Sequence, residues 1–496
     1  MRKPRGLGIL PLSLCILIWT AGCSHANFNF GGGGGGAKTA PMLLTFHDTP
    51  AAGITVTSFE VTVTGAVLQP GNVSLLSAPQ TIELTQLQTN SAFLSTTNVP
   101  FGTYTSLTLT YASPQYTFLN NSGVQVTAGG QPCAAGASCV VTSPTASPLT
   151  LTLSAPAFPS VPVTSASTQT LLEVDVNLNN IIQPNFSLNF GPSASGGSGA
   201  VTVTQSSGTG TPSKIGNFNV TGQIASVTTS PDQFKLTTST GQITIQAVSP
   251  DFEFARANCT NNNFTCLAAG QIVDANVDIF SDGSLSATEV DFDDASGTQQ
   301  VSGIIVTENN SPPTSFQMIV RNTIPPVASL PPGTPVTVNI SGTASFFINN
   351  GSFVLPTGVS FASTSDVIVG QEVEARVASG TSISSGAFTT DRLALEQTQV
   401  QSKVTSLSAT AQPPQPSFAL NPLPPLFVSP VTQIFVLTVT QGTTGLTQFQ
   451  ALTPNDITGL TDLQPVTVSG FLFNTTGTVG SPTIVATTVR GEVPGT

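Results

Sequence analysis

A two-residue alternation of apolar and polar side chains runs through much of this chain and restricts it to β structure. In FEVTVTGAVLQP, Val61 and Val63 alternate with Thr62 and Thr64, and the pattern returns in TIELTQLQ, TYTSLTLTYA and LLEVDVNLNNII. Such alternation places one set of side chains on a core face and the other in solvent. Clusters of Pro, Gly and Asn separate the runs at the spacing of sandwich strands. The sequence therefore predicts an all-β protein.

The charge content excludes several partners. Charged residues make up 7% of the 496 residues, compared with about 25% in an average soluble domain. With 39% hydrophobic residues the chain is too apolar to be intrinsically disordered. The chain has only 12 basic residues and 24 acidic ones. Nucleic-acid binding needs clustered Lys and Arg to neutralise phosphates. We expect no nucleic-acid partner, and the length indicates several domains.

The first 22 residues have the pattern of an export signal. Three basic residues lie within the first five, and an apolar run from Leu7 to Trp19 follows, too short to cross a bilayer as an ordinary helix. The segment TAGC, which ends at Cys23, resembles the lipobox of bacterial lipoproteins, although Thr20 stands where Leu, Val or Ile is usual. The resemblance implies that Cys23 is lipidated and that residues 1–22 are removed. Ser24 then implies sorting to the outer membrane. The alternative is a plain secretory signal with an incidental cysteine.

Residues 23–39 contain the six consecutive glycines Gly31–Gly36. A phosphate-binding loop needs a strand before it, a helix after it and a Lys-Ser/Thr ending, and the sequence offers none of these. We therefore predict a flexible tether. Removal of residues 1–22 takes away three of the 12 basic residues and none of the 24 acidic ones, which leaves nine basic residues and a net charge of −15. An anionic membrane surface would repel such a body, so the lipid would have to provide the membrane contact.

Four cysteines outside the signal and lipobox form two close pairs. Cys133 and Cys139 lie in QPCAAGASC, and Cys259 and Cys266 lie in NCTNNNFTC. Each pair brackets a loop of small or polar residues in an exported chain, which predicts two loop-closing disulfides. A zinc site is the alternative, but it would need both pairs to meet across two domains, and the whole chain has only two histidines.

Residues 40–192 are predicted to form a β-sandwich. The segments LTFHDTPA, IELTQLQ, VPFGTYTSLTL and LLEVDVNLNNII resemble the bacterial lipoprotein family called domain of unknown function 4382. The matching positions are Asp48, Pro50, Ile82, Glu83 (where Asp is usual), Leu84, Pro100, Gly102 and Tyr104. The resemblance covers roughly a third of the chain and implies a sandwich without implying an activity.

A linker at residues 193–215, with one strand-like AVTVT inside it, precedes a threefold internal repeat. The predicted units are 216–298, 299–399 and 400–493. They open with NVTGQIASVTTSPDQFKL, QVSGIIVTENNSPPTSFQM and QVQSKVTSLSATAQPPQPSFAL. Their shared pattern, G-x-[IV]…F-x-[LM]…G-x-x-V-x-[AV], resembles the repeat family called domain of unknown function 5666. It also resembles small OB-like barrels of five strands. The third unit lacks the first glycine, with Ser402 near its place.

Few residues suit catalysis. His47-Asp48 is the one adjacent His/Asp pair, and no G-x-S-x-G motif supplies a nucleophile for it. Asp48, which stands before Thr49-Pro50, is interpreted as a turn residue that ends the first strand. The folded region contains one histidine, so general acid–base catalysis by histidine has a single candidate residue. We predict that the protein is not an enzyme and uses no cofactor.

The densest carboxylate set lies in the first repeat. Asp274, Asp278 and Asp282 are weak calcium candidates, because FSDGS has a turn but not the spacing of a D-x-D-x-D-G loop. Strand alternation puts Asp274 and Asp278 on one face, which is equally typical of a solvated barrel wall. The set continues with Glu289, Asp291, Asp293 and Asp294.

These observations predict a non-enzymatic cell-envelope lipoprotein, held at the outer membrane by its lipid. The tandem β domains would act as a surface adhesive or a scaffold and spacer arm, with an envelope polysaccharide or protein as partner. The alternative is an extracytoplasmic ligand-binding module for polysaccharide or calcium. Aromatic composition gives sugar binding little support, because 29 Phe accompany 3 Tyr and a single Trp that lies in the signal. Carbohydrate platforms usually expose Trp or Tyr.

Overall fold

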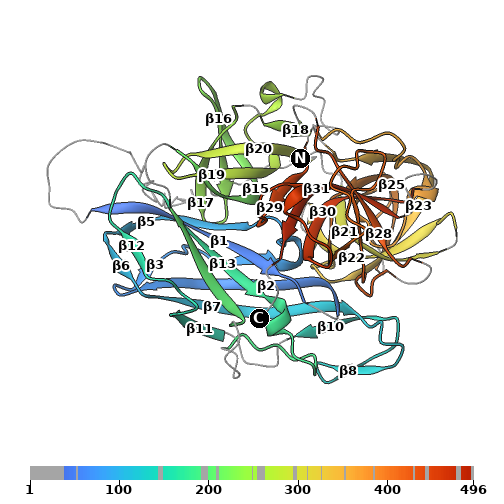
Figure 1. Ribbon diagram of the computed structural model, residues 1–496, viewed down its shortest axis with the longest axis horizontal. Coiled ribbons are helices and arrows are strands. Elements are labelled where there is room, and N and C mark those ends of the chain that lie inside the picture. Colours follow the sequence, from blue (N-terminus) through green and yellow to red (C-terminus); the bar gives the residue numbers. More distant parts are fainter. Residues whose placement is uncertain are drawn as a thin grey trace, which may run out of the picture. The chain divides into compact units, whose positions relative to one another are not determined.

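The alternating segments form strands throughout the computed structural model, so the predicted all-β class is confirmed; Figure 1 shows the strands from β1 in blue to β31 in red. The structure describes residues 38–51, 54–142, 149–191, 199–207, 212–248, 250–253, 263–293, 299–309, 311–324, 327–350, 353–383, 386–427, 431–441, 446–475 and 482–492. Lys38–Thr496 forms one compact unit. Within the described ranges no helix is long and apolar enough to cross a membrane.

The N-terminal module has two main sheets. One runs in the order β14-β13-β1-β5, with β1 and β13 parallel, and the other in the order β10-β7-β2-β3, with β11 and β4 at its side. Apolar residues of both sheets share one core, in which Phe46 of β1 and Val174 of β13 pack with Val63 of β2 and Tyr111 of β7. The elements are β1 (Thr39–Thr49), β2 (Thr55–Gln69), β3 (Val73–Ser74), β4 (Gln80–Glu83), η1 (Leu84–Gln86), β5 (Ala92–Pro100), β6 (Gly102–Tyr104), β7 (Ser106–Leu119), β8 (Val126–Ala128), β9 (Gln131–Cys133), β10 (Ser138–Thr142), β11 (Leu149–Ser154), β12 (Val161–Val163), β13 (Thr170–Asn177), α1 (Leu178–Ile181) and β14 (Val201–Ser207).

Strand β14 lies inside the segment that the sequence indicated as a linker. It pairs antiparallel with β13 from Thr170 to Val176, and its Val201 and Val203 are buried in the core of the N-terminal module. The first module therefore extends beyond residue 192, because the Val-Thr alternation of AVTVT supplies an edge strand with a buried face.

The first repeat is joined to this sheet through the pair Asn219–Ala92 of β15 and β5. Within the repeat, β15 pairs with β16, β16 with β17, β17 with β20, β20 with β19, and β19 with β15. The β17–β20 contact is the single pair Gln246–Ser286. The elements are β15 (Lys214–Thr229), β16 (Asp232–Thr238), β17 (Gly241–Gln246), β18 (Asp251–Glu253), η2 (Phe264–Cys266), β19 (Ile272–Phe280) and β20 (Leu285–Asp293).

The second repeat is a closed five-stranded barrel in the order β21-β22-β23-β25-β24, with β23 and β25 parallel. Its core includes Val301, Phe316, Val338, Val373 and Leu393. The elements are β21 (Gln300–Asn309), β22 (Ser315–Ile324), β23 (Pro335–Ile348), η3 (Thr364–Asp366), β24 (Glu372–Val377) and β25 (Ala387–Glu396).

The third repeat has the sheet order β28-β27-β26-β30-β31-β29, with a further parallel pairing of β28 with β31. Its first two strands pair only through Val404–Leu420 and Thr405–Ala419. The elements are β26 (Thr398–Thr405), β27 (Phe418–Leu420), β28 (Ile434–Thr438), β29 (Gln448–Gln450), η4 (Ile457–Gly459), β30 (Pro465–Phe473) and β31 (Thr483–Gly491).

All three repeats share one turn, which stands between the short 3-10 helix of the repeat and the strand that follows it, β19, β24 or β30. Gly270, Gly370 and Leu463 occupy it with φ of 91°, 91° and 66°, a region that glycine adopts more readily than other residues. Their backbone N–H groups donate to Ile224, Ile305 and Val404 of the respective first strands, at 2.8, 2.9 and 2.8 Å. The next residue is glutamine each time. Its side-chain oxygen accepts from the backbone N–H three residues earlier, at 2.6 Å for Gln271, 2.8 Å for Gln371 and 2.9 Å for Gln464.

The glycine that the third repeat lacks explains its weaker strand pairing. A Cβ on Gly303 would lie 2.1 Å from the Ile319 carbonyl oxygen of β22, and one on Gly222 would lie 2.7 Å from that of Thr237 in β16. The glycine thus lets the second strand approach the first. Ser402 holds this position in the third repeat, and its hydroxyl donates to the Pro422 carbonyl at 2.6 Å. The chain after β27 therefore follows β26 as a loop rather than as a strand.

Candidate functional site

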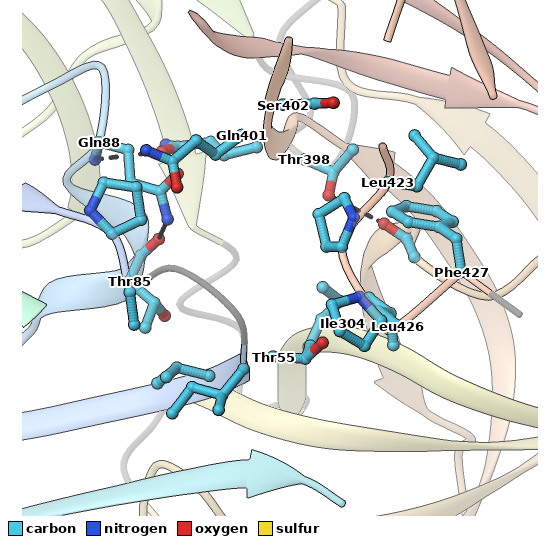
Figure 2. A pocket seen from close by; sticks show the side chains of 18 of the residues that line it. Thr55, Thr85, Gln88, Ile304, Thr398, Gln401, Ser402, Leu423, Leu426 and Phe427 are labelled. Atoms are coloured by element: carbon cyan, nitrogen blue, oxygen red, sulfur yellow. Dashed lines mark hydrogen bonds between the residues drawn. The ribbon is translucent and has the colours of Figure 1, made fainter. Parts of the chain in front are cut away.

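A cavity of about 450 Å³ lies where the N-terminal module, the barrel and the third repeat meet. We call it the junction cavity, and Figure 2 shows its labelled side chains around an open space. The N-terminal module lines it with Asp48, Pro50, Ala51, Ile54–Val56, Thr85, Gln88 and Leu178, the barrel with Ile304, Arg321 and Gly370, and the third repeat with Thr398, Gln399, Gln401–Lys403, Pro422–Phe427 and Pro465.

One wall of the junction cavity is apolar. It consists of the loop Pro422–Phe427, whose sequence is PLPPLF, together with Ile304 of β21. In Figure 2 Leu423, Leu426 and Phe427 lie together on one side of the open space, with Ile304 next to Leu426. Three of the six loop residues are prolines and have no N–H to satisfy, so the loop can border a cavity with few exposed donors.

The polar residues of the lining include buried atoms without a hydrogen-bond partner among the described residues. Both carboxyl oxygens of Asp48, the hydroxyl of Thr55 and the side-chain oxygen of Gln88 are buried and have no hydrogen-bond partner among the described residues. Asp48 is 0% exposed and Thr55 is 7% exposed. Unsatisfied buried polar groups are rare in folded proteins, and each costs about 1–3 kcal/mol. The presence of several such groups at one cavity therefore makes this cavity the candidate binding site.

The structure corrects the interpretation of Asp48 as a turn residue. Asp48 lies inside β1, which ends at Thr49, and its backbone N–H donates to the Leu87 carbonyl at 3.1 Å. Burial raises the pKa of the Asp48 carboxyl well above its ordinary value, and the nearby Asp175, Glu83 and Glu492 raise it further. A buried acid of this kind holds its proton to higher pH and can then donate a hydrogen bond.

A buried ion pair stands at the edge of the cavity. Arg321 of β22 is 8% exposed, and its Nη1 lies 3.4 Å from Oε2 of Glu372, which is 4% exposed. The amide of Gln86 donates to Glu372 at 2.8 Å. Burial raises the pKa of Glu372, while Arg321 and the Gln86 hydrogen bond act in the opposite direction. The charge of Arg321 is thus offset inside the site.

Hydrogen bonds between modules fix the walls of the cavity. The backbone N–H of Gln88 donates to Gln399 Oε1 at 3.1 Å, and Gln399 Nε2 donates to the Gln86 carbonyl at 2.8 Å. The Thr117 hydroxyl donates to the Gly333 carbonyl at 3.0 Å. Residues separated by more than 200 positions therefore hold the site together.

His47 has a structural set of contacts. It is 3% exposed, its Nε2 lies 3.1 Å from the Gln88 carbonyl oxygen and contacts Arg490 Nη1, and its Nδ1 lies 3.5 Å from Asp175. The Thr49 hydroxyl also donates to Asp175, at 2.9 Å. These partners tie β1 to β13 and β31.

The three calcium candidates do not converge. Asp274 accepts from the Thr221 hydroxyl at 2.7 Å, Asp278 pairs with Lys214 at 2.7 Å, and Asp282 accepts from the Ser284 N–H at 2.9 Å. The Ser284 hydrogen bonds lower the pKa of Asp282. In the described part of the chain no group of three or more His, Cys, Asp or Glu is arranged to hold a metal ion. The structure thus does not bring the candidates together, because strand spacing separates Asp274 from Asp278 and a local turn engages Asp282.

Cys133 and Cys139 form a disulfide, with Cα atoms 5.9 Å apart. Cys266 is also disulfide-bonded, and its predicted partner Cys259 lies outside the described residues. Cys23 lies outside them too, so its lipidation stays a prediction.

Sequence reasoning missed Thr55, Gln88, Arg321 and the loop Pro422–Phe427. Of these, only the loop has a recognisable sequence feature, its cluster of prolines. Comparison with protein-family models and with curated proteins finds no match to this chain.

Proposed function

We propose that this protein is a non-enzymatic lipoprotein of the cell envelope whose junction cavity binds a small, uncharged ligand with a polar and an apolar face. The observation that carries the proposal is that three residues lining the cavity, Asp48, Thr55 and Gln88, have buried side-chain oxygens without a hydrogen-bond partner among the described residues. A ligand that hydrogen-bonds to them removes a cost that the folded protein otherwise bears.

Size and lining support a small molecule. A volume of about 450 Å³ lies within the range of roughly 300–1,000 Å³ that small-molecule sites occupy. The apolar loop Pro422–Phe427 faces polar groups, so the bound molecule needs one apolar face and hydroxyl or amide groups on the other. A sugar unit with an apolar substituent has this character.

The charges of the cavity favour an uncharged ligand. Burial raises the pKa of the Asp48 carboxyl, which favours its neutral form, and Arg321 is paired with Glu372. Lys403 is exposed at the lining. Apart from the exposed Lys403, the described lining residues thus offer no unpaired charge, and a ligand charge buried away from Lys403 would bear a large desolvation cost.

We also propose the finer architecture behind this site: a β-sandwich followed by three OB-like barrels. Two sheets around one core support the sandwich. The closed order β21-β22-β23-β25-β24, with the third and fifth strands parallel, supports the barrel, and the first and third repeats show the corresponding pairings. The resemblance to the two families of unknown function is consistent with this proposal.

The envelope location rests on the lipobox and on the Gly-rich segment, with Cys23 as the lipid attachment site at the outer membrane. Among the two predicted roles, the inter-module hydrogen bonds of Gln88 and Gln399 favour ligand binding over a spacer arm. A spacer needs no cavity between its modules.

Ligand-observed NMR tests the proposal. Saturation transfer would be measured from the unit Lys38–Thr496, which contains every described residue, to a panel of neutral saccharides, alkyl glycosides and their charged analogues. We expect transfer to at least one neutral amphipathic member and none to its charged analogue.

A matched pair of variants locates the binding. Gln401→Trp fills the cavity, in which Gln401 is a lining residue without a described side-chain hydrogen bond, and should abolish the transfer. Gln246→Trp makes the same change at an exposed position of β17 and should leave it intact. Absence of transfer to every neutral amphipathic panel member, or survival in Gln401→Trp of the transfer to its apolar group, would contradict the proposal.

A further inference from the structure

A second hollow region lies where the first repeat faces the barrel and the third repeat, and it shares only the lining residues Arg321 and Gln399 with the junction cavity. Two hollows of about 270 and 250 Å³ share the lining residues Asn90, Asn276, Glu289 and Gln397. We call them together the amide cleft, because asparagine and glutamine dominate the lining. The other amide residues are Gln86, Asn217, Asn219, Asn322, Asn349, Asn350, Gln399 and Gln448.

The amide groups are held in place by one another. Asn217 Nδ2 donates to Asn90 Oδ1 at 3.1 Å, Asn219 Nδ2 donates to Asn276 Oδ1 at 3.2 Å, and Asn276 Nδ2 donates to Glu289 Oε2 at 2.7 Å. A primary amide has two donor hydrogens and an acceptor oxygen, so each of these bonds leaves further capacity. Side chains that are already ordered lose little entropy when a ligand binds.

One lining residue of the same region also carries a buried donor. Arg321 lines the cleft and is 8% exposed, and its Nε–H has no hydrogen-bond partner among the described residues. Its Nη1 pairs with Glu372. The Nε–H is thus a buried donor whose hydrogen bond remains to be made, independently of the amide array.

The charges define what the cleft can accept. Carboxylates in its lining outnumber cations: Asp274, Asp278, Glu289, Glu372, Glu374 and Glu396 accompany Arg321 and Lys214. Such a lining repels phosphate, sulfate and uronate groups. Amides and carboxylates together offer donors and acceptors to hydroxyl groups, each of which is itself a donor and an acceptor. Phe353 and exposed Leu446 add an apolar surface at one end.

We infer that the amide cleft binds an uncharged polysaccharide strand through its hydroxyl groups. The two hollows sharing four lining residues provide length for more than one sugar unit. Recognition here proceeds through hydrogen bonds rather than through stacked Trp or Tyr rings, which is why aromatic composition gave no sign of it. This inference goes beyond the small-ligand site and does not depend on it.

Affinity electrophoresis of the purified full-length protein tests the inference. The gels would contain dextran, barley β-glucan, galactomannan or xylan as neutral probes and polygalacturonate as the acidic probe. We expect retardation by at least one neutral polymer and none by polygalacturonate. Retardation by the acidic polymer alone, or by none of the probes, would overturn the inference.

Variants assign the retardation to the cleft. Asn90→Ala should lower the affinity by about threefold to tenfold, the equivalent of one net hydrogen bond, and Asn90→Ala with Gln397→Ala should lower it further. Gln205→Ala, the same type of change on β14, should have no effect, and neither should the cavity-filling Gln401→Trp. If Asn90→Ala does not fold, the exposed Gln448→Ala takes its place. Equal affinity of wild type and the cleft variants would overturn the inference, while failure of the junction cavity alone would leave it standing.

Discussion

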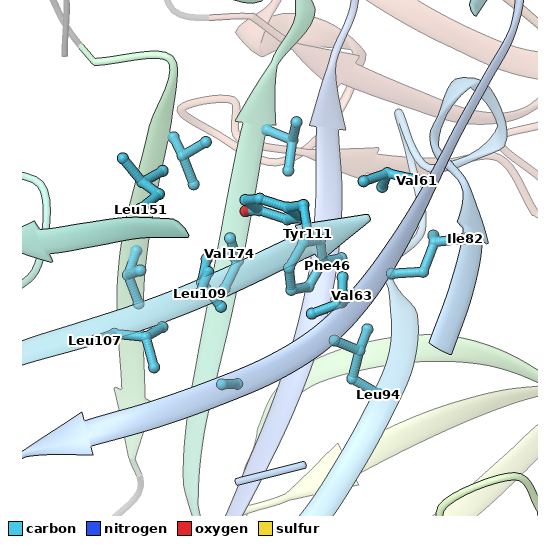
Figure 3. Packing of buried hydrophobic residues seen from close by; sticks show 14 of the residues in the cluster. Phe46, Val61, Val63, Ile82, Leu94, Leu107, Leu109, Tyr111, Leu151 and Val174 are labelled. Atoms are coloured by element: carbon cyan, nitrogen blue, oxygen red, sulfur yellow. The ribbon is translucent and has the colours of Figure 1, made fainter. Parts of the chain in front are cut away.

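Removal of a tyrosine hydroxyl group from β7 should have opposite effects on the free energy of unfolding at two positions, Tyr111 and Tyr116. Tyr111 and Tyr116 are 0% and 1% exposed, and both lie in the core of the N-terminal module. In Figure 3 the Tyr111 ring lies beside Phe46 among aliphatic side chains. Its hydroxyl has no hydrogen-bond partner among the described residues, whereas the Tyr116 hydroxyl donates to the Phe186 carbonyl at 2.8 Å. Burial raises the pKa of both phenols, so both stay protonated.

The magnitudes follow from these partners. An unsatisfied buried hydroxyl costs about 1–3 kcal/mol, so Tyr111→Phe should raise the free energy of unfolding by about 1–2 kcal/mol. Tyr116→Phe removes a hydrogen bond and leaves a carbonyl unsatisfied, so it should lower the free energy of unfolding by about 1–2 kcal/mol. The aromatic ring stays in both variants, so packing is preserved.

Tyrosine fluorescence provides a selective assay. The three tyrosines of the chain, Tyr104, Tyr111 and Tyr116, all lie in the N-terminal module, and the single tryptophan, Trp19, lies outside Lys38–Thr496. Urea unfolding of this unit, followed by tyrosine emission, therefore reports on that module alone. The midpoint should rise for Tyr111→Phe and fall for Tyr116→Phe with the slope unchanged. A fall for both variants would mean that the buried Tyr111 hydroxyl does not destabilise the folded protein.

Two further predictions concern the barrel and Asp48. Gly303→Ala places a Cβ 2.1 Å from a carbonyl oxygen of β22 and should destabilise the protein by about 1–3 kcal/mol or more. Gly342→Ala, where nothing lies within 4 Å of the added carbon, should change the stability of the protein little. Equal shifts of the melting temperature in the two variants would contradict this prediction. Because the folded pKa of Asp48 is raised above the ordinary 3.8, its contribution to stability is present below that value and is lost as pH rises toward the raised pKa. Asp48→Asn should therefore gain stability relative to wild type as the pH of a urea titration rises from about 4 to 7, and a difference independent of pH would argue against a charge effect.

The sequence predicted the parts of the fold that depend on local pattern. Alternation in FEVTVTGAVLQP corresponds to β2, and the glycines of the first two repeats occupy turns and close approaches that need them. The short spacing of Cys133 and Cys139 indicated the disulfide that the structure shows. The missing glycine at Ser402 also marked the repeat whose first two strands pair least.

The candidate site could not be predicted in the same way. An Asp followed by Thr-Pro is typical of a turn, and nothing nearby in the sequence shows that Asp48 is buried by distant elements. Gln88 and Gln399 are 311 positions apart, and no local pattern encodes such a contact. The Asn and Gln residues of the amide cleft could not be predicted either, because in the sequence they look the same as polar residues on the solvent-exposed face of a strand.

The most direct test of the junction cavity is a crystal structure of Lys38–Thr496 with the tightest neutral member of the saccharide and alkyl glycoside panel. We expect the ligand to lie against Pro422–Phe427 and to place polar groups within hydrogen-bond distance of Gln88 Oε1 and the Thr55 hydroxyl. A ligand bound elsewhere, with these oxygens paired to protein groups instead, would contradict this expectation.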